Sequence, residues 1–393
     1  MPIEQFSPPF SQAAVDELRE RLARTRWVDQ VPNSDWQYGF NLDFLKDLCR
    51  YWQQEFDWKA QLNKFAAFHH YRFTHDGIGI HFIHERGKGK SPLPIIVTHG
   101  WPGSFLEMLR LIPKLSDPAA NGGDVSDSFD VIVPSLPGYG YSDRPAQTGM
   151  NAWRIADIWA ALMRELGYER FAVQGGDLGA AVSTALALRH SDHIIGINLN
   201  YIPGSYQPFL PPEAKLTSVE QDFVKERARW YEQNGAYAHI QRTHPQTAAY
   251  GLNDSPAALL AWIAEKFRDW SDCNGDLYSR FTKDELLTNV TLYWMTETIH
   301  SSFRLYWEGA RAPMQFREGE FVSVPCAITR FPKEAPFPPR EYVERGYNVQ
   351  RWTEMERGGH FAAAEEPQLL AEDIRGFFAA CGARLSTTGL FQR

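Results

Sequence analysis

Residues 171–179 read Phe-Ala-Val-Gln-Gly-Gly-Asp-Leu-Gly, and this stretch decides the fold class of the chain. Its first four residues form a short, mostly apolar run that is typical of a buried strand, and a helical pattern follows from Leu178 to Arg189. Glycines on both sides of Asp177 suit a sharp turn, because larger side chains would collide where strand and helix meet. The stretch therefore predicts a strand–turn–helix unit that lifts the side chain of Asp177 above one end of a sheet.

Asp177 has two interpretations in this turn. An aspartate that follows glycines and precedes a helix is common as a simple helix cap. The pattern small-x-nucleophile-x-small is also that of a turn that presents a nucleophile, and it aims the backbone N–H of Leu178 and the helix N-terminus at the same point. The pentapeptide alone leaves both interpretations open, so other motifs have to decide between them.

Short strands alternate with helices along much of the chain. The strands are expected at 70–74, 78–84, 94–98, 129–133, 171–174, 194–199, 326–331 and 349–355, and helices between or after them at 153–166, 178–189 and 367–378. Asp76-Gly77 between the first two strands is a hairpin-type turn. This alternation predicts an α/β fold with a mostly parallel central sheet flanked by helices.

Two helical blocks are added to this pattern. Near the N-terminus, Ser11 and Asn41 are placed to cap two helices with apolar stripes. Later in the chain, helices rich in aromatic residues are expected at 217–234, 255–269 and 282–308. We therefore divide the chain into an N-terminal helical segment that wraps the core (1–77), a first part of the core (78–204), a helical lid (205–320) and a second part of the core (321–393).

The sequence His99-Gly100-Trp101-Pro102 directly follows the expected strand 94–98. In folds with a nucleophile turn, a loop after an early strand donates a backbone N–H to an oxyanion hole. We expect the N–H groups of Trp101 and Leu178 to be the two donors. His99 is expected to hydrogen-bond within the loop rather than to act in catalysis.

His360 lies on a glycine-rich loop after the last expected strand, in the chain order nucleophile, acid, base that this kind of site requires. The acid should follow the preceding strand, where Glu334 comes 26 residues before His360. It would hold the imidazole in one tautomer and stabilise the imidazolium. Glu344 is the alternative, although its stretch looks helical and solvated, and Glu354 and Glu356 rank lower because they belong to the last strand region.

With these motifs in place, the chain resembles the microsomal-type epoxide hydrolases, a group that includes the juvenile-hormone and fungal enzymes. The resemblance covers nearly the whole chain, including the N-terminal segment and residues 99–104, 175–179, 331–334 and 358–361. It implies the α/β-hydrolase fold with an inserted lid, and the conversion of an epoxide and water to a vicinal diol. It also implies that Asp177 is the nucleophile, that His360 is the general base and that Glu334 is the charge-relay acid.

The resemblance further implies two lid tyrosines that hydrogen-bond the epoxide oxygen and donate a proton to it. They correspond to Tyr237, within 235–241, and Tyr306, within 303–306. The chain departs from the family at two points. Leu178 stands where members often have tryptophan, which keeps the backbone donor but changes the pocket wall, and the membrane anchor of mammalian members is not visible.

Composition excludes several other classes of protein. With 44% hydrophobic and 22% charged residues and a net charge of −8, the chain is typical of a globular protein and shows no basic surplus for nucleic acid. Its four cysteines are scattered, so neither a disulfide framework nor a zinc site is expected. We expect a cytoplasmic protein with no membrane anchor, no metal and no organic cofactor, and with a small-molecule epoxide as its partner. A homodimer is one candidate assembly.

Two rival functions stay open. A haloalkane dehalogenase shares the fold and an aspartate nucleophile, but it needs donors for a halide in place of phenols. A catalytically silent protein that holds a small ligand under the lid would also fit the fold, although the three residues expected to act together are intact. The aromatic residues of the lid and of the N-terminal segment favour an apolar substrate that carries an aryl group.

Overall fold

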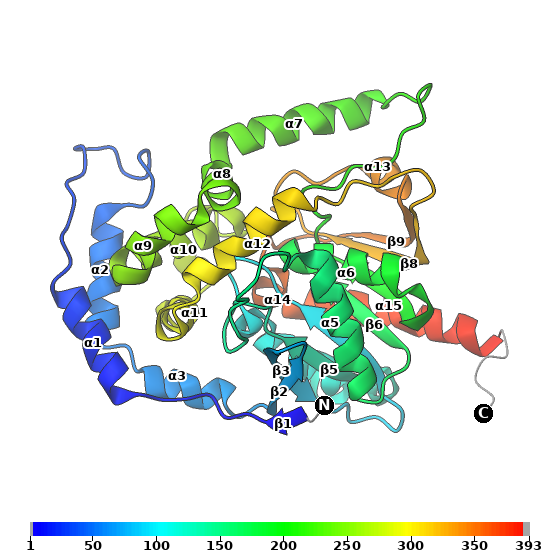
Figure 1. The fold of residues 1–393 in the computed structure, drawn as a ribbon, viewed down its shortest axis with the longest axis horizontal. Coiled ribbons are helices and arrows are strands. Elements are labelled where there is room, and N and C mark those ends of the chain that lie inside the picture. Colours follow the sequence, from blue (N-terminus) through cyan, green and yellow to red (C-terminus); the bar gives the residue numbers. More distant parts are fainter. Residues whose placement is uncertain (1–2, 388–393) are drawn as a thin grey trace.

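The structure is a computed structural model that describes residues 3–387. Within these residues the core is a nine-stranded sheet in the order β1-β2-β3-β5-β4-β6-β7-β8-β9 (Figure 1). The strands are β1 (Ile3–Gln5), β2 (His70–His75), β3 (Ile78–Glu85), β4 (Leu93–Thr98), β5 (Phe129–Pro134), β6 (Phe171–Gly175), β7 (Ile194–Leu199), β8 (Val322–Arg330) and β9 (Tyr347–Glu354). Strands β5, β4, β6, β7, β8 and β9, which are neighbours in that order, run parallel. At the other edge, β1 pairs with β2, β2 with β3 and β3 with β5, and these three pairs are antiparallel. The predicted α/β fold with a mostly parallel sheet is confirmed.

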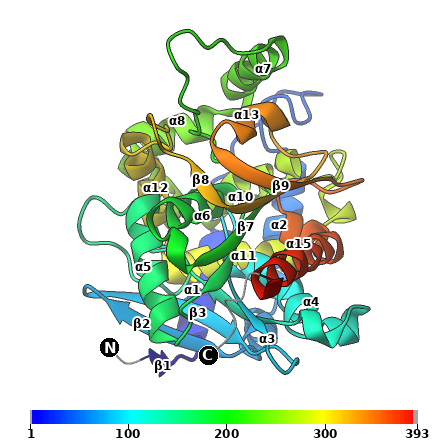
Figure 2. The ribbon, with the colours of Figure 1, turned by 90° about the vertical axis from the view of Figure 1, so that its right-hand side faces the viewer.

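Helices cover both faces of the sheet, with α5 and α6 on one side and α4 and α15 on the other (Figure 2). Every residue of β5, β6 and β7 is buried, as expected for strands with helices on both faces. The core helices are α4 (Ile112–Ser116), α5 (Ala152–Glu165), α6 (Asp177–Arg189), α13 (Arg340–Glu344), α14 (Ala362–Glu365) and α15 (Pro367–Thr387). The core also has the 3₁₀ turns η1 (Phe105–Arg110), η2 (Pro118–Asn121), η3 (Val125–Asp127) and η4 (Ser191–His193), and η5 (Leu277–Ser279) lies in the lid.

The N-terminal segment forms three helices, α1 (Gln12–Ala23), α2 (Leu42–Gln54) and α3 (Trp58–Phe65), and it also supplies β1 and β2 to the sheet edge. The hairpin between β2 and β3 turns at Asp76 and Gly77, which both have positive φ (49° and 76°), as a tight hairpin turn requires. Ser11 and Asn41 cap α1 and α2 as predicted, each accepting a backbone N–H three residues on.

The same segment packs on the lid (Figure 1). The buried indole of Trp52 on α2 donates to Thr291 Oγ1 in the lid at 2.9 Å, and Tyr51 and Gln61 both donate to Asp284 at 2.8 Å. These bonds join parts of the chain that are more than 200 residues apart. The N-terminal segment therefore holds the lid to the sheet from outside.

The lid comprises α7 (Ser218–Asn234), α8 (Ala236–Thr243), α9 (Pro245–Asp254), α10 (Pro256–Trp270), α11 (Lys283–Thr296) and α12 (Ile299–Arg311). Helix α12 packs on α8 and α9, and α7 extends away from them along the top of the molecule (Figure 1). Within residues 3–387, no helix is both long and apolar enough to cross a membrane.

The single helix predicted at 282–308 is wrong, because the chain breaks it into α11 and α12. Glu297 adopts the left-handed conformation (φ 52°), and the N–H of Thr298 bonds to the carbonyl of Tyr293. This is the hydrogen-bond pattern of a helix C-terminus, in which glycine usually occupies the left-handed position. Since glutamate stands there, the sequence gives no signal for the break.

Candidate active site

Asp177 is the first residue of α6 and has a positive φ of 47°, so the turn after β6 is as sharp as the motif predicts. The flanking positions must be glycine, because a side chain there would collide with backbone atoms. A Cβ on Gly179 would lie 2.1 Å from the carbonyl oxygen of Thr98, and one on Gly175 would lie 2.4 Å from the carbonyl oxygen of Gly179. The cap position of α6 is held by Gly176, and the Asp177 carboxylate is directed elsewhere.

The loop after β4 approaches this carboxylate closely. The backbone N–H of Trp101 donates to Asp177 Oδ1 at 2.9 Å, and Gly100 permits the approach because a Cβ there would lie 2.4 Å from the Asp177 Cβ. The peptide bond between Trp101 and Pro102 is cis. Leu178, the other expected donor, follows Asp177 in the first turn of α6 and lines the adjacent cavity.

His99 is buried beneath this loop and makes two hydrogen bonds. Its Nδ1 donates to the carbonyl of Gly100 at 3.0 Å, and its Nε2 accepts the N–H of Leu136 at 3.1 Å. Burial lowers the pKa of His99 to about 4, so the ring stays neutral. As expected, His99 bonds to its own loop, and it joins this loop to the chain that follows β5.

His360 and Glu334 meet at the ends of β9 and β8. His360 Nδ1 donates to Glu334 Oε1 at 2.7 Å, and His360 Nε2 lies 3.4 Å from Asp177 Oδ2. The three side chains therefore form a continuous chain of contacts. The rival acids lie elsewhere: Glu344 pairs with Arg340 at the surface, Glu354 with Arg330 and Glu356 with Arg357.

The two carboxylates control the charge of the imidazole. Burial alone lowers the pKa of His360, but the negative charge of Glu334 and the hydrogen bonds to Asp177 and Glu334 outweigh it and hold the pKa well above its ordinary value. Glu334 is almost fully buried and also accepts the N–H of Ala335 at 2.8 Å. These influences together favour the protonated, charged form of the imidazole.

The lid fixes the loop that carries His360, a feature that the sequence motifs do not predict. The N–H of His360 donates to the carbonyl of Trp270 at the end of α10, and the Trp270 ring lies edge-on to the imidazole with the ring centres 5.2 Å apart. The Glu365 carboxylate accepts the N–H groups of Asp272 (2.7 Å) and Phe361 (3.0 Å), which ties the lid to the same loop.

Tyr237 on α8 and Tyr306 on α12 face each other above Asp177, with ring centres 6.0 Å apart. The Trp101 ring stacks on Tyr237 at 5.2 Å and meets Tyr306 edge-on at 5.7 Å. Burial is the main influence that raises the pKa of each phenol well above 10, and the charge of Asp177 adds to it. Both hydroxyl groups are therefore protonated at neutral pH.

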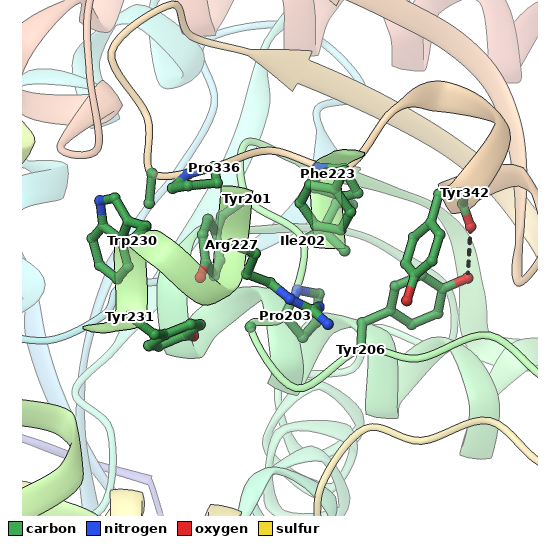
Figure 3. Close-up of a pocket in the computed structure, with 13 residues that line it drawn as sticks. Tyr201, Ile202, Pro203, Tyr206, Phe223, Arg227, Trp230, Tyr231, Pro336 and Tyr342 are labelled. Atoms are coloured by element: carbon green, nitrogen blue, oxygen red, sulfur yellow. Dashed lines mark hydrogen bonds between the residues drawn. The ribbon is translucent and has the colours of Figure 1, made fainter. Parts of the chain in front are cut away.

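Asp177, Tyr237 and Tyr306 all line one cavity of about 840 Å³ between the sheet and the lid. The other walls are largely apolar and include Leu136 and Ile155. A smaller pocket adjoins it on the side of α7 and is lined by Trp230, Tyr231 and Arg227 among others (Figure 3). Tyr201 lines both spaces, and its ring lies edge-on to His360 with the centres 5.8 Å apart.

The described residues contain no group of three or more histidine, cysteine, aspartate or glutamate side chains that could hold a metal ion. What the site offers is a carboxylate on a strand–turn–helix unit, a backbone donor facing it, and a histidine oriented by a buried acid. This combination is that of an α/β hydrolase with a carboxylate at the position of the nucleophile turn.

The comparison with known proteins agrees with this class and narrows it. Residues 94–287 match the family described as the alpha/beta hydrolase fold, and residues 3–108 match the family described as the epoxide hydrolase N terminus. The chain is 36% identical to epoxide hydrolase 1 of Oryctolagus cuniculus over 95% of this chain and 88% of that protein. A candidate epoxide hydrolase of Stigmatella aurantiaca is 43% identical over 97% of this chain and 86% of its own length. The chain belongs to the epoxide hydrolase family.

Solved structures agree with the sequence comparison. The juvenile hormone epoxide hydrolase of Bombyx mori superimposes with a TM-score of 0.84 at 31% identity, covering 97% of this chain and 94% of that one. The Aspergillus niger epoxide hydrolase gives a TM-score of 0.83 at 26% identity, covering 97% of both chains. The N-terminal segment, the core and the lid are therefore all part of the family's fold.

Proposed function

We propose that this epoxide hydrolase opens apolar epoxides by attack of Asp177 on a ring carbon, and that water then hydrolyses the resulting ester to give a vicinal diol. The observation that carries the proposal is that Tyr237, Tyr306 and Asp177 converge on one cavity. An epoxide needs a nucleophile at carbon and an acid at oxygen at the same time. Two protonated phenols opposite one carboxylate supply both, whereas displacement of a halide needs no phenolic acid.

In the first half of the reaction, Tyr237 and Tyr306 hydrogen-bond the epoxide oxygen and donate a proton as the C–O bond breaks. The raised pKa of each phenol keeps it protonated until that moment. Asp177 Oδ2 faces His360, and Oδ1 accepts the N–H of Trp101, so the carboxylate is held in a fixed orientation for attack.

In the second half, His360 takes a proton from water, and the water oxygen attacks the carbonyl carbon of the ester. Ester formation removes the negative charge of Asp177, which is one of the influences that raise the pKa of His360. The imidazole then releases its proton more readily; this proton restores the phenol that was ionised in the first half, and the neutral imidazole becomes a base. The N–H groups of Trp101 and Leu178 hold the oxyanion, and Glu334 stabilises the imidazolium that forms.

An aspartate suits this chemistry better than a serine, because opening of an epoxide by serine leaves an ether that water does not readily cleave. We propose that the chain works without metal or organic cofactor, since each step is assigned to one of its own side chains. Its cytoplasmic location and a homodimeric assembly stay predictions. Cys49, Cys273 and Cys326 are buried and form no disulfide, which is typical of a reducing compartment.

Product analysis tests the proposal. The protein is incubated with styrene oxide, a wider epoxide panel and a haloalkane panel, and diols and halide are measured. We expect diols from the epoxides, none from Asp177→Ala, and wild-type rates from Asp192→Ala, which removes an exposed aspartate in the 3₁₀ turn η4 that follows α6. Halide release without diol formation would favour a dehalogenase, and neither product would favour a silent ligand-binding protein.

A further inference from the structure

We propose that Glu107 binds and orients the water that hydrolyses the ester on Asp177. This inference rests on the proposed function, because it assigns a role within the second half of that reaction. Glu107 lies on η1, directly after the loop that carries Trp101, and the sequence motifs give it no role. Three features of its surroundings carry the inference.

The first feature is a small cavity, separate from the cavity that holds the phenols. It measures about 20 Å³, which is enough for one water molecule. Asp177, His360 and Glu107 all line it. Of the residues that line the two cavities, Asp177 is the one that they share. An epoxide can therefore reach the carboxylate from the large cavity while water occupies the small one.

The second feature is that the Glu107 carboxyl has no protein partner, since no hydrogen bond or ion pair joins it to another described residue. Of the other polar side chains at this cavity, Gln174 Nε2 donates to Asn200 Oδ1 at 2.8 Å and His360 Nδ1 donates to Glu334, while Gln174 Oε1 is a buried acceptor without a partner. A carboxyl that faces a one-water cavity gains most by bonding to that water, because a buried polar group without a partner is costly.

The third feature is the space that Gly103 leaves for this carboxyl. A Cβ on Gly103 would lie 1.0 Å from Glu107 Oε1, so any side chain at position 103 would displace the carboxyl. The backbone there is fixed, because the Tyr293 hydroxyl donates to the Gly103 carbonyl at 2.7 Å. The absence of a side chain at 103 thus sets the position of Glu107.

Burial raises the pKa of Glu107 to about 8; the charges of Asp177 and Glu365 add to this, and His360 opposes it. The carboxyl is therefore neutral at pH 7. A neutral carboxyl can accept one hydrogen bond from water without competing with His360 for the proton. The water oxygen forms its bond to the Asp177 carbonyl carbon, its proton goes to His360 Nε2, and the C–O bond to the product breaks as that proton passes to the departing alkoxide.

Two substitutions at position 107 separate hydrogen bonding from packing. Glu107→Gln keeps the size, the neutrality and the hydrogen-bonding capacity of the protonated acid, and Glu107→Leu keeps the approximate size alone. In Glu107→Leu we expect styrene oxide to form the ester at the wild-type rate, and the ester to be hydrolysed about 100-fold more slowly because the water is misplaced. Glu107→Gln should hydrolyse the ester at close to the wild-type rate.

Gly103→Ala tests the same idea without changing Glu107 itself. The new methyl group pushes the carboxyl out of position, so ester hydrolysis should slow as in Glu107→Leu while ester formation is retained. Rapid mixing followed by acid quench and intact-protein mass spectrometry measures both steps, since the ester adds the mass of the epoxide to the protein.

The inference is overturned if Glu107→Leu hydrolyses the ester at the wild-type rate, or if Glu107→Gln is as slow as Glu107→Leu. It is also overturned if ester formation slows as much as hydrolysis, because that result indicates general structural damage. A failure of the proposed function looks different: no ester would form on Asp177 in the wild type or in any variant, whatever stands at position 107.

Discussion

Replacing Glu107 by glutamine should stabilise the protein, and the gain should grow with pH. The pKa of Glu107 is raised from 4.5 to about 8 in the folded protein, mainly by burial. Below pH 4.5 the carboxyl is protonated in both the folded and the unfolded chain, so its ionisation does not lower the free energy of unfolding. Between pH 4.5 and about 8 the unfolded chain gains the ionised form and the folded protein does not, so stability falls as pH rises.

The size of the effect follows from this window. Each pH unit within this window lowers the free energy of unfolding by about 1.36 kcal/mol. The wild type therefore loses about 3 kcal/mol of this free energy at pH 7 and less than about 1 kcal/mol at pH 5. A glutamine side chain does not ionise, so it causes no such pH-dependent loss of stability. Glu107→Gln should therefore raise the free energy of unfolding by up to about 3 kcal/mol at pH 7, with little gain at pH 5.

Urea unfolding of the wild type and of Glu107→Gln at pH 5, 6 and 7 measures the difference in their free energies of unfolding. The comparison requires that this free energy falls with urea concentration at the same slope in both proteins. Glu344→Gln is the matched control, because Glu344 is exposed and, within residues 3–387, its ion-pair partner is Arg340 alone. Its effect should be small at every pH. A gain for Glu107→Gln that does not change with pH, or a loss at pH 7, would refute the reasoning that this carboxyl is held neutral.

Three further predictions concern the phenols, the acid and the lid. Tyr237→Phe or Tyr306→Phe should slow ester formation about tenfold to 100-fold and leave ester hydrolysis unchanged, as seen by rapid quench; equal slowing of both steps would contradict the role of the phenols. Glu334→Gln should lower kcat by roughly 10³-fold to 10⁴-fold, because the amide no longer selects the tautomer or stabilises the imidazolium, and a loss below about tenfold would contradict it. Thr291→Val leaves the buried Trp52 indole without its acceptor and should cost about 1–3 kcal/mol in urea unfolding, whereas unchanged stability would show that this bond does not secure the lid.

The fold was predictable from the sequence where strands are buried on both sides and where turns demand glycine. The runs at 129–133, 171–174 and 194–199 are apolar because helices cover both faces of the sheet, and β5, β6 and β7 lie there. The helix break at Glu297 was not predictable, because the residue in the left-handed conformation is a glutamate, where glycine would have been a signal.

The candidate site was predictable where chain order constrains it. Asp177, Glu334 and His360 each follow a strand of the parallel sheet, and the carboxyl ends of parallel strands meet at one edge, so the three side chains come together. Tyr237 and Tyr306 came from the family resemblance, since spacing does not distinguish two tyrosines among sixteen. The structure places both rings beside Trp101.

Other parts of the site depend on contacts between distant segments and leave no local signal. The bond from the His360 N–H to the Trp270 carbonyl joins the lid to the loop of His360 across 90 residues of chain. Glu107 reaches the small cavity only because Gly103 leaves room for its carboxyl. A glycine four residues before a glutamate looks ordinary in the sequence, so both features needed the structure.

The covalent ester on Asp177 is the central claim, and isotope labelling tests it most directly. Enzyme in excess is mixed with styrene oxide in water enriched in oxygen-18 for one turnover, and the diol and the peptide that carries Asp177 are analysed by mass spectrometry. The account predicts an unlabelled diol from the first turnover, with label appearing in Asp177 after repeated turnovers. A diol that already carries solvent oxygen in the first turnover would show that water attacks the epoxide directly and that Asp177 is not the nucleophile.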